Sequence, residues 1–111
     1  MSNQIIDKSL AWIGNNHSSD TSGWVTIVSG ITYQKFGRVV VLMVESVTVA
    51  TGSQVICTVP TGILPSLNVQ PFMRASSTLI QSWITQDGKV NVNNNTGTTI
   101  SNLAGFAVWI V

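Results

Sequence analysis

The sequence predicts an all-β protein, folded as an antiparallel β-barrel or a jelly-roll-like sandwich. Val, Ile, Thr and aromatic residues recur in short runs, and clusters of Gly, Pro, Asn, Ser and Asp separate these runs. Beyond the first dozen residues, no stretch keeps the apolar period of 3.6 residues that an amphipathic helix requires. A chain of 111 residues is long enough for one domain with one hydrophobic core.

Four strands are predicted in the first half of this domain, at residues 24–28, 32–36, 38–50 and 54–59. β-branched and aromatic side chains dominate these segments, and such side chains fit a pleated sheet surface. The third strand ends at Thr51-Gly52-Ser53, whose residue types are common in turns.

Five strands are predicted in the second half, at residues 67–75, 78–86, 89–93, 98–101 and 105–111. Pro60-Thr61-Gly62 and Pro65-Ser66 frame the loop that precedes them. The polar segment NNNTG at residues 93–97 is a connection, because Asn and Gly tolerate left-handed backbone conformations.

The turn Gln86-Asp87-Gly88 sets the register of the hairpin that it closes. A two-residue Asp-Gly loop would place Ile84 opposite Asn91, which mixes core and surface positions. A three-residue loop with Gly88 in the left-handed conformation places Ile84 opposite Val90, so that both point inward. We expect the three-residue loop.

This register gives the hairpin a mixed aromatic and polar outer face. The residues on that face are Gln81, Trp83, Thr85, Lys89, Asn91 and Asn93. The C–H face of a sugar packs on an aromatic ring, while its hydroxyls need donors and acceptors such as amides provide. Trp83, Gln81, Asn91 and Asn93 are therefore candidate saccharide ligands. Burial of Trp83 at a subunit contact is the alternative, since Trp is also enriched there.

Two predicted strands are apolar on both faces. In residues 38–50, one face carries Val40, Leu42 and Val44 and the other carries Val39, Val41 and Met43. Residues 105–111 are likewise apolar on both faces. The sequence predicts no helix that could cover a second face, so we expect sister chains to cover it around a symmetry axis. The predicted interface residues are Val39, Val41, Met43, Trp109 and Val111. A folded-over N-terminal segment or a second sheet is the alternative cover.

Composition excludes several classes of partner and chemistry. Only 8% of residues are charged and the net charge is +1, so we expect no nucleic-acid binding. No apolar run approaches the roughly 20 residues that span a bilayer, so no membrane insertion is expected. The four acidic residues suggest neither a catalytic pair nor a calcium loop, and we expect no enzyme activity, metal or cofactor.

Two further regions carry polar candidates for ligand binding. His17 and Asp20 lie in the segment NNHSSD near Trp24, and together they could bond to and stack on a glycan. A solvated linker loop is the alternative for this segment. Arg74 could grip an anionic group through its planar guanidinium, or it could cap the edge of a trimer.

Four segments and their order carry a resemblance to a known family. They are Trp24-Val25, YQKFGRVVV at residues 33–41, TVPTGILP at residues 58–65 and ITQDGKVNV at residues 84–92, followed by an aromatic last strand. The chain resembles the C-terminal head domains of bacteriophage tail-fibre and baseplate receptor-binding proteins. Val59 replaces the usual Leu before the loop's first Pro, and Ile63-Leu64 replaces the usual aromatic-basic pair.

The resemblance implies a homotrimeric head at the virion tail tip that binds saccharide on the bacterial surface and contacts other phage tail proteins. Residues 21–111 would form the head, and residues 1–20 a linker or a remnant of the shoulder that precedes it. Two alternatives remain open. The chain is a structural tail-tip or assembly module without sugar binding, or it is a free-standing cellular lectin or adhesin.

Overall fold

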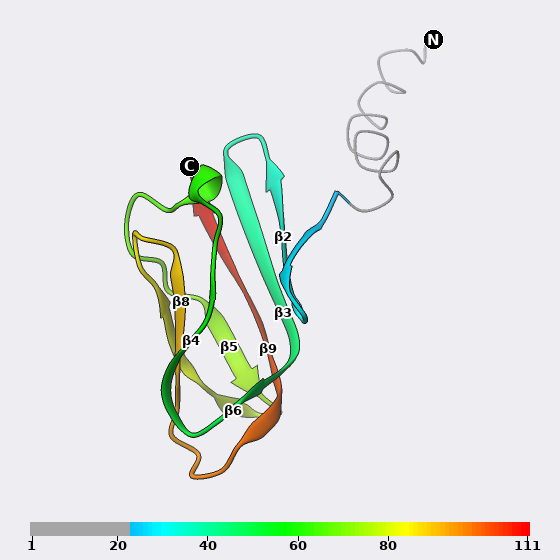
Figure 1. Ribbon diagram of the computed structural model, residues 1–111, viewed down its shortest axis with the longest axis vertical. Helices are drawn as coiled ribbons and strands as arrows, with labels where there is room; N and C mark the ends of the chain where they lie inside the picture. The colour runs from blue at the N-terminus through cyan, green and yellow to red at the C-terminus, as the bar shows by residue number, and fades with distance from the viewer. Residues whose placement is uncertain (1–22) are drawn as a thin grey trace.

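The computed structural model describes residues 23–111 as two antiparallel β-sheets that pack against each other (Figure 1). The strands are β1 (Val25–Val28), β2 (Ile31–Phe36), β3 (Val39–Val49), β4 (Gly52–Thr58), β5 (Phe72–Ala75), β6 (Thr78–Leu79), β7 (Gln81–Ile84), β8 (Lys89–Asn94) and β9 (Ile100–Ile110). The larger sheet has the order β1-β2-β3-β9-β5-β6, and the smaller sheet has the order β4-β8-β7. Within residues 23–111 the only helix is a short 3₁₀ turn, η2 (Thr61–Ile63), and none could span a membrane.

β3 and β9 form the centre of the larger sheet. Val40 pairs with Trp109 and Leu42 with Ala107, and these four side chains point toward the smaller sheet and are buried. The residues between them point to the opposite, outer face of the sheet. Successive apolar residues of β3 therefore alternate between the two faces of the sheet, and both faces are apolar, as predicted.

One hydrophobic core fills the space between the sheets. Its buried members are Ile31, Val40, Leu42, Val44, Val49, Cys57, Val59, Ile63, Met73, Ala75, Ile80, Ile84, Val90, Val92, Leu103, Ala107 and Trp109. Both sheets contribute to this set, so neither could bury its apolar face without the other.

Trp109 corrects one prediction. We expected it at a subunit interface, but its side chain lies in the core of its own chain, where the residue is 6% exposed. Its Nε1 donates a hydrogen bond of 2.8 Å to the carbonyl oxygen of Ile63, which satisfies the one polar atom of the indole. Val111 is also partly buried against this core, at the end of β9. Neither side chain belongs to the exposed face of the larger sheet.

The chain crosses from the larger sheet to the smaller one at Ile80. β6 pairs with β5, whereas β7 pairs with β8, so the single strand predicted at residues 78–86 is two strands. The Ile80 side chain is buried, and its backbone N–H donates a 2.9 Å hydrogen bond to the carbonyl oxygen of Met73. These two contacts hold the crossing in place.

Two other predicted boundaries also differ from the structure. Residues 98–101 and 105–111 were expected as separate strands, but β9 runs continuously from Ile100 to Ile110. The strand expected at residues 67–75 begins only at Phe72. Before it, Val69 makes an isolated β-bridge to Ile84.

The sandwich prediction is confirmed, and no closed barrel is found. The smaller sheet covers the inner face of β3 and β9, so a second sheet does account for one of their two apolar faces. Their outer face keeps a set of exposed or half-buried apolar side chains, which continue onto β5. We call this set the outer apolar face; it consists of Val39, Val41, Met43, Phe72, Phe106, Val108 and Ile110.

Candidate functional site

The β7–β8 hairpin has the predicted register. Trp83 pairs with Asn91 and Ile84 with Val90, and Gly88 has a φ of 87°. The backbone N–H of Gly88 donates a 2.8 Å hydrogen bond to the carbonyl oxygen of Thr85, which closes the three-residue loop. A Cβ atom at Gly88 would lie 2.7 Å from Leu64 Cδ2 and 2.9 Å from Val59 Cγ2. Backbone conformation and close packing therefore both require glycine at this position.

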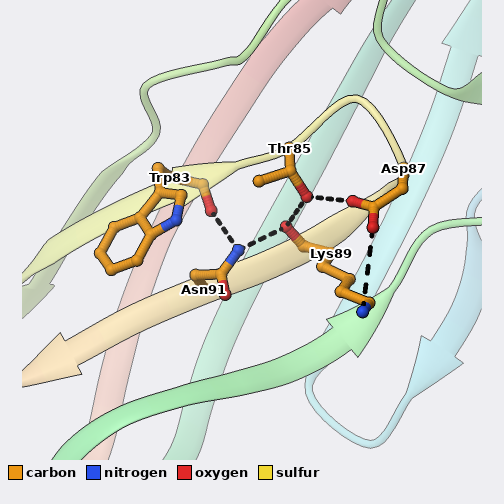
Figure 2. A network of polar contacts seen from close by, with 5 residues as sticks. All are labelled: Trp83, Thr85, Asp87, Lys89 and Asn91. Atoms are coloured by element: carbon orange, nitrogen blue, oxygen red, sulfur yellow. Dashed lines mark hydrogen bonds and ion pairs between the residues drawn. The ribbon is translucent and has the colours of Figure 1, made fainter.

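The outer face of this hairpin carries a continuous polar network (Figure 2). Asn91 Nδ2 donates to the carbonyl oxygens of Trp83 and Lys89, at 3.4 and 3.0 Å. The Thr85 hydroxyl donates to Asp87 Oδ1, and Lys89 Nζ lies 3.8 Å from Asp87 Oδ2. The half-buried Trp83 ring lies beside Asn91, at the end of the network farthest from Asp87.

The remaining two predicted platform residues lie next to this network. Asn93 pairs with Gln81 across the strands, and Asn93 Nδ2 donates a 3.3 Å hydrogen bond to Gln81 Oε1. The structure therefore brings all four expected side chains to one face of the smaller sheet. We call Gln81, Trp83, Asn91 and Asn93 the platform.

The charges near the turn are balanced. A hydrogen bond from the Thr85 hydroxyl holds the pKa of the Asp87 carboxyl below its usual value, and the Lys89 ammonium lowers it further. Asp87 is therefore ionised at neutral pH. The Asp87 carboxylate lies beside the Lys89 ammonium, whose charge is equal and opposite, so this end of the hairpin carries no net charge.

A loop that follows η2 is attached to the hairpin at three places. Gln86 Nε2 donates to the carbonyl oxygen of Ser66. The backbones of Val69 and Ile84 exchange two hydrogen bonds of 2.9 Å. Gln70 Nε2 donates to the carbonyl oxygen of Ser82 at 2.6 Å.

Between this loop and the turn lies an open hollow of about 420 Å³. Its lining residues are Asn68, Thr85, Gln86, Asp87, Lys89 and Asn91. Sequence reasoning did not identify Asn68, Gln86 or Asp87 as site residues. Asn68 lies 17 positions from Thr85 in the chain, and the bridge between Val69 and Ile84 helps to bring the two segments together.

The other predicted ligand residues do not join the platform. Arg74 and Trp24 are associated with the larger sheet. Arg74 Nη1 donates to the carbonyl oxygen of Ser76 at 3.0 Å. Trp24 makes an edge-to-face contact with Phe36, with ring centroids 6.5 Å apart. His17 and Asp20 lie outside the described residues.

The outer apolar face lies on the opposite side of the sandwich from the platform. Met43, Phe72, Phe106, Val108 and Ile110 each keep more than a third of their surface exposed. The rings of Phe72 and Phe106 pack against each other with centroids 5.9 Å apart. Of the predicted interface residues, Val39, Val41 and Met43 belong to this face.

Within residues 23–111, no group of His, Cys, Asp and Glu side chains could hold a metal ion. The only cysteine of the chain, Cys57, is buried in the core. The polar chemistry that the hairpin presents consists of amides, hydroxyls, one carboxylate and one ammonium.

Comparison with known proteins gives a match to a solved structure but none to a family or to a curated sequence. Among solved structures, the chain is similar to the head domain of lactococcal phage bIL170, described as a receptor-binding domain. The two share 16% sequence identity with a TM-score of 0.52, over 79% of this chain and 96% of that one. The chain therefore has the fold of a lactococcal phage receptor-binding head domain, as its sequence motifs predict.

Proposed function

We propose that this protein attaches a bacteriophage to its bacterial host by binding a saccharide on the host surface. The observation that carries the proposal is the combination of the head-domain fold with an aromatic and amide platform on one exposed sheet. In this proposal the protein acts at the virion tail tip, where it also contacts other tail proteins.

The platform has the chemistry that a pyranose ring needs. The ring face of Trp83 packs on sugar C–H groups, while the amides of Gln81, Asn91 and Asn93 exchange hydrogen bonds with the hydroxyls. Trp83 is half-buried and lies beside an Asn91 amide that is fixed by two hydrogen bonds. Little side-chain entropy is therefore lost when a ligand binds.

The outer apolar face supports assembly as a homotrimer. Its seven side chains form a contiguous apolar surface on three neighbouring strands, and monomeric proteins rarely leave such surfaces exposed. Packing around a three-fold axis would cover the face and leave the three platforms outward. Weak binding at each platform would then be multiplied by simultaneous attachment to a repetitive polymer.

The proposed attachment involves no chemical turnover. Binding through C–H stacking and neutral hydrogen bonds leaves the polymer intact, so its length distribution should not change on prolonged incubation. A fall in polymer size during incubation with the pure protein would identify an enzyme instead.

The proposal is tested by cell adsorption. The purified protein, fluorescently labelled, is incubated with candidate host cells and with wall polysaccharide extracted from them. Trp83→Ala should reduce binding to both at least tenfold, because stacking on an aromatic ring supplies a large share of sugar-binding energy. Trp24→Ala is the matched control, since this second tryptophan lies on the larger sheet and should leave binding unchanged.

Two results would count against the proposal. Equal loss in both tryptophan variants would place the receptor site away from the platform. A wild-type protein that binds no cells and no wall polysaccharide, but does bind other tail proteins, would identify an assembly module. The outer apolar face is the surface that such a module would use.

A further inference from the structure

We infer that the site takes at least two consecutive units of an uncharged glycan, one on the platform and the next in the hollow beside Asp87. This inference rests on the proposed function and adds the size and the charge of the ligand. It is carried by the continuity of the two surfaces and by the balance of donors and acceptors in the hollow.

The platform and the hollow share one residue. Asn91 pairs with Trp83 on the platform and also lines the hollow. A glycan that stacks on Trp83 therefore lies next to a residue that lines the hollow. The hollow is open to solvent, and its volume of about 420 Å³ leaves room for a further sugar unit to rest against its lining residues.

The hollow offers several free acceptors, beside the donors of the Asn68 amide and the remaining N–H groups of Lys89. Asn91 Nδ2 already donates to two backbone carbonyl oxygens, so Oδ1 is its remaining hydrogen-bonding group. Gln86 Nε2 donates to Ser66, which leaves Oε1 of Gln86 available. The Thr85 hydroxyl donates to Asp87 Oδ1, which leaves Oδ2, 3.8 Å from Lys89 Nζ, able to accept from a ligand.

Acceptor atoms such as these favour ligands that donate hydrogen bonds. Sugar hydroxyls donate hydrogen bonds, whereas phosphate diesters and ionised carboxylates only accept them. An anionic group in the hollow would meet the Asp87 carboxylate, and the nearby cation, Lys89, is already paired with that carboxylate. Hydroxyl groups bonded to Asp87 Oδ2 make charge-assisted hydrogen bonds, which are stronger than neutral ones.

Two substitutions distinguish an uncharged ligand from an anionic one. Asp87→Asn removes the negative charge but keeps an Asn-Gly turn, which suits the same loop, and Thr85 still has an oxygen to donate to. Lys89→Met removes the positive charge and keeps an unbranched side chain of similar length. Both sites are exposed, so thermal unfolding of either variant should match the wild type within about 2 °C.

The experiment is a glycan array followed by calorimetric titration of the strongest hits. The array carries neutral mono-, di- and trisaccharides together with uronic-acid and phosphate-bearing counterparts of the same length. We expect neutral disaccharides and trisaccharides to bind at least tenfold more tightly than the monosaccharides. Asp87→Asn should weaken this binding about tenfold or more, whereas Lys89→Met, which also changes the lining of the hollow, should weaken it less than Asp87→Asn does.

The opposite ranking would overturn the inference. If anionic glycans bind best, Lys89→Met should be the damaging variant and Asp87→Asn should strengthen binding. If monosaccharides bind as tightly as longer glycans and only Trp83→Ala matters, the hollow holds no sugar, although the proposed function stands. If the wild type binds no glycan and no host cell, the proposed function itself fails.

Discussion

Val108→Lys should convert the proposed trimer into folded monomers. Val108 lies on β9 in the middle of the outer apolar face, between Phe106 and Ile110, and it is 49% exposed in the single chain. Because its outer half does not contact the core, lysine at this position can extend into solvent in a monomer. At a subunit contact, the same lysine would be buried without a partner.

The magnitude follows from the exposed fraction. Burying the remaining half of a valine side chain contributes about 1 kcal/mol per chain, half of the value for a fully buried side chain. Burying an unpaired ammonium costs about 3 kcal/mol or more per chain. Three copies in a trimer therefore lose roughly 12 kcal/mol in total, and each 1.4 kcal/mol is a factor of ten in the assembly constant.

The assay is light scattering coupled to size exclusion at low micromolar concentration. The wild type should have three times the chain mass of 11.9 kDa, and Val108→Lys should have the mass of one chain. Val55→Lys is the matched control, because Val55 is also 49% exposed but lies on β4 in the smaller sheet. It should leave the trimer intact.

Two outcomes would refute the reasoning. A wild-type mass of one chain would show that the outer apolar face is not a subunit contact, and its cover would have to be sought in another protein or in residues 1–22. A Val108→Lys variant that remains trimeric would show that the chains meet through a different surface. Circular dichroism of each variant checks that loss of mass does not reflect unfolding.

Three further predictions concern the core. Ser82→Ala should raise the free energy of unfolding by about 1 kcal/mol in urea titrations, because the buried Ser82 hydroxyl has no hydrogen-bond partner among the described residues; a loss of stability would indicate an internal water bonded to it. Asn94→Asp should lower the free energy of unfolding by about 3 kcal/mol or more. The buried Asn94 Nδ2 donates to the carbonyl oxygens of Val49, Ala50 and Thr98, and a carboxylate in its place would repel them. Asn95→Asp, at an exposed position, is the control and should have little effect. Burial raises the pKa of the Cys57 thiol from 9.0 to about 11, so the folded state keeps a proton that the unfolded state releases. The contribution of Cys57 to stability should therefore be constant below pH 9 and fall by up to about 2–3 kcal/mol toward pH 11. Cys57→Ala should remove this slope, and an unchanged slope would assign it to other groups.

The features that sequence could predict are local ones. Alternation along the β7–β8 hairpin allowed only one loop length, because a one-residue shift would have exposed Ile84 and Val90. The left-handed Gly88 and the pairing of Trp83 with Asn91 followed from that choice, and both are confirmed. The platform was predictable for the same reason.

The features that sequence could not predict depend on contacts between distant segments. β9 is apolar on both sides, so alternation alone could not show which side meets the smaller sheet. That choice places Trp109 in the core, where its indole donates to Ile63, 46 positions earlier in the chain. The split of residues 78–86 at Ile80 is also a property of two sheets, since each half finds a different partner strand.

The position of β9 within the larger sheet has a consequence for biosynthesis. β9 lies between β3 and β5, and Val39 pairs with Ile110 across 71 positions of sequence. While a ribosome is still making residues 100–110, the nascent chain carries two strand edges with unpaired backbone groups and apolar side chains on both faces of β3. Such edges readily pair with other chains, so crowded polysomes would favour aggregation of unfinished chains. Completion of β9 removes both edges at once, and the yield of folded protein should therefore depend strongly on temperature and on chaperones during synthesis.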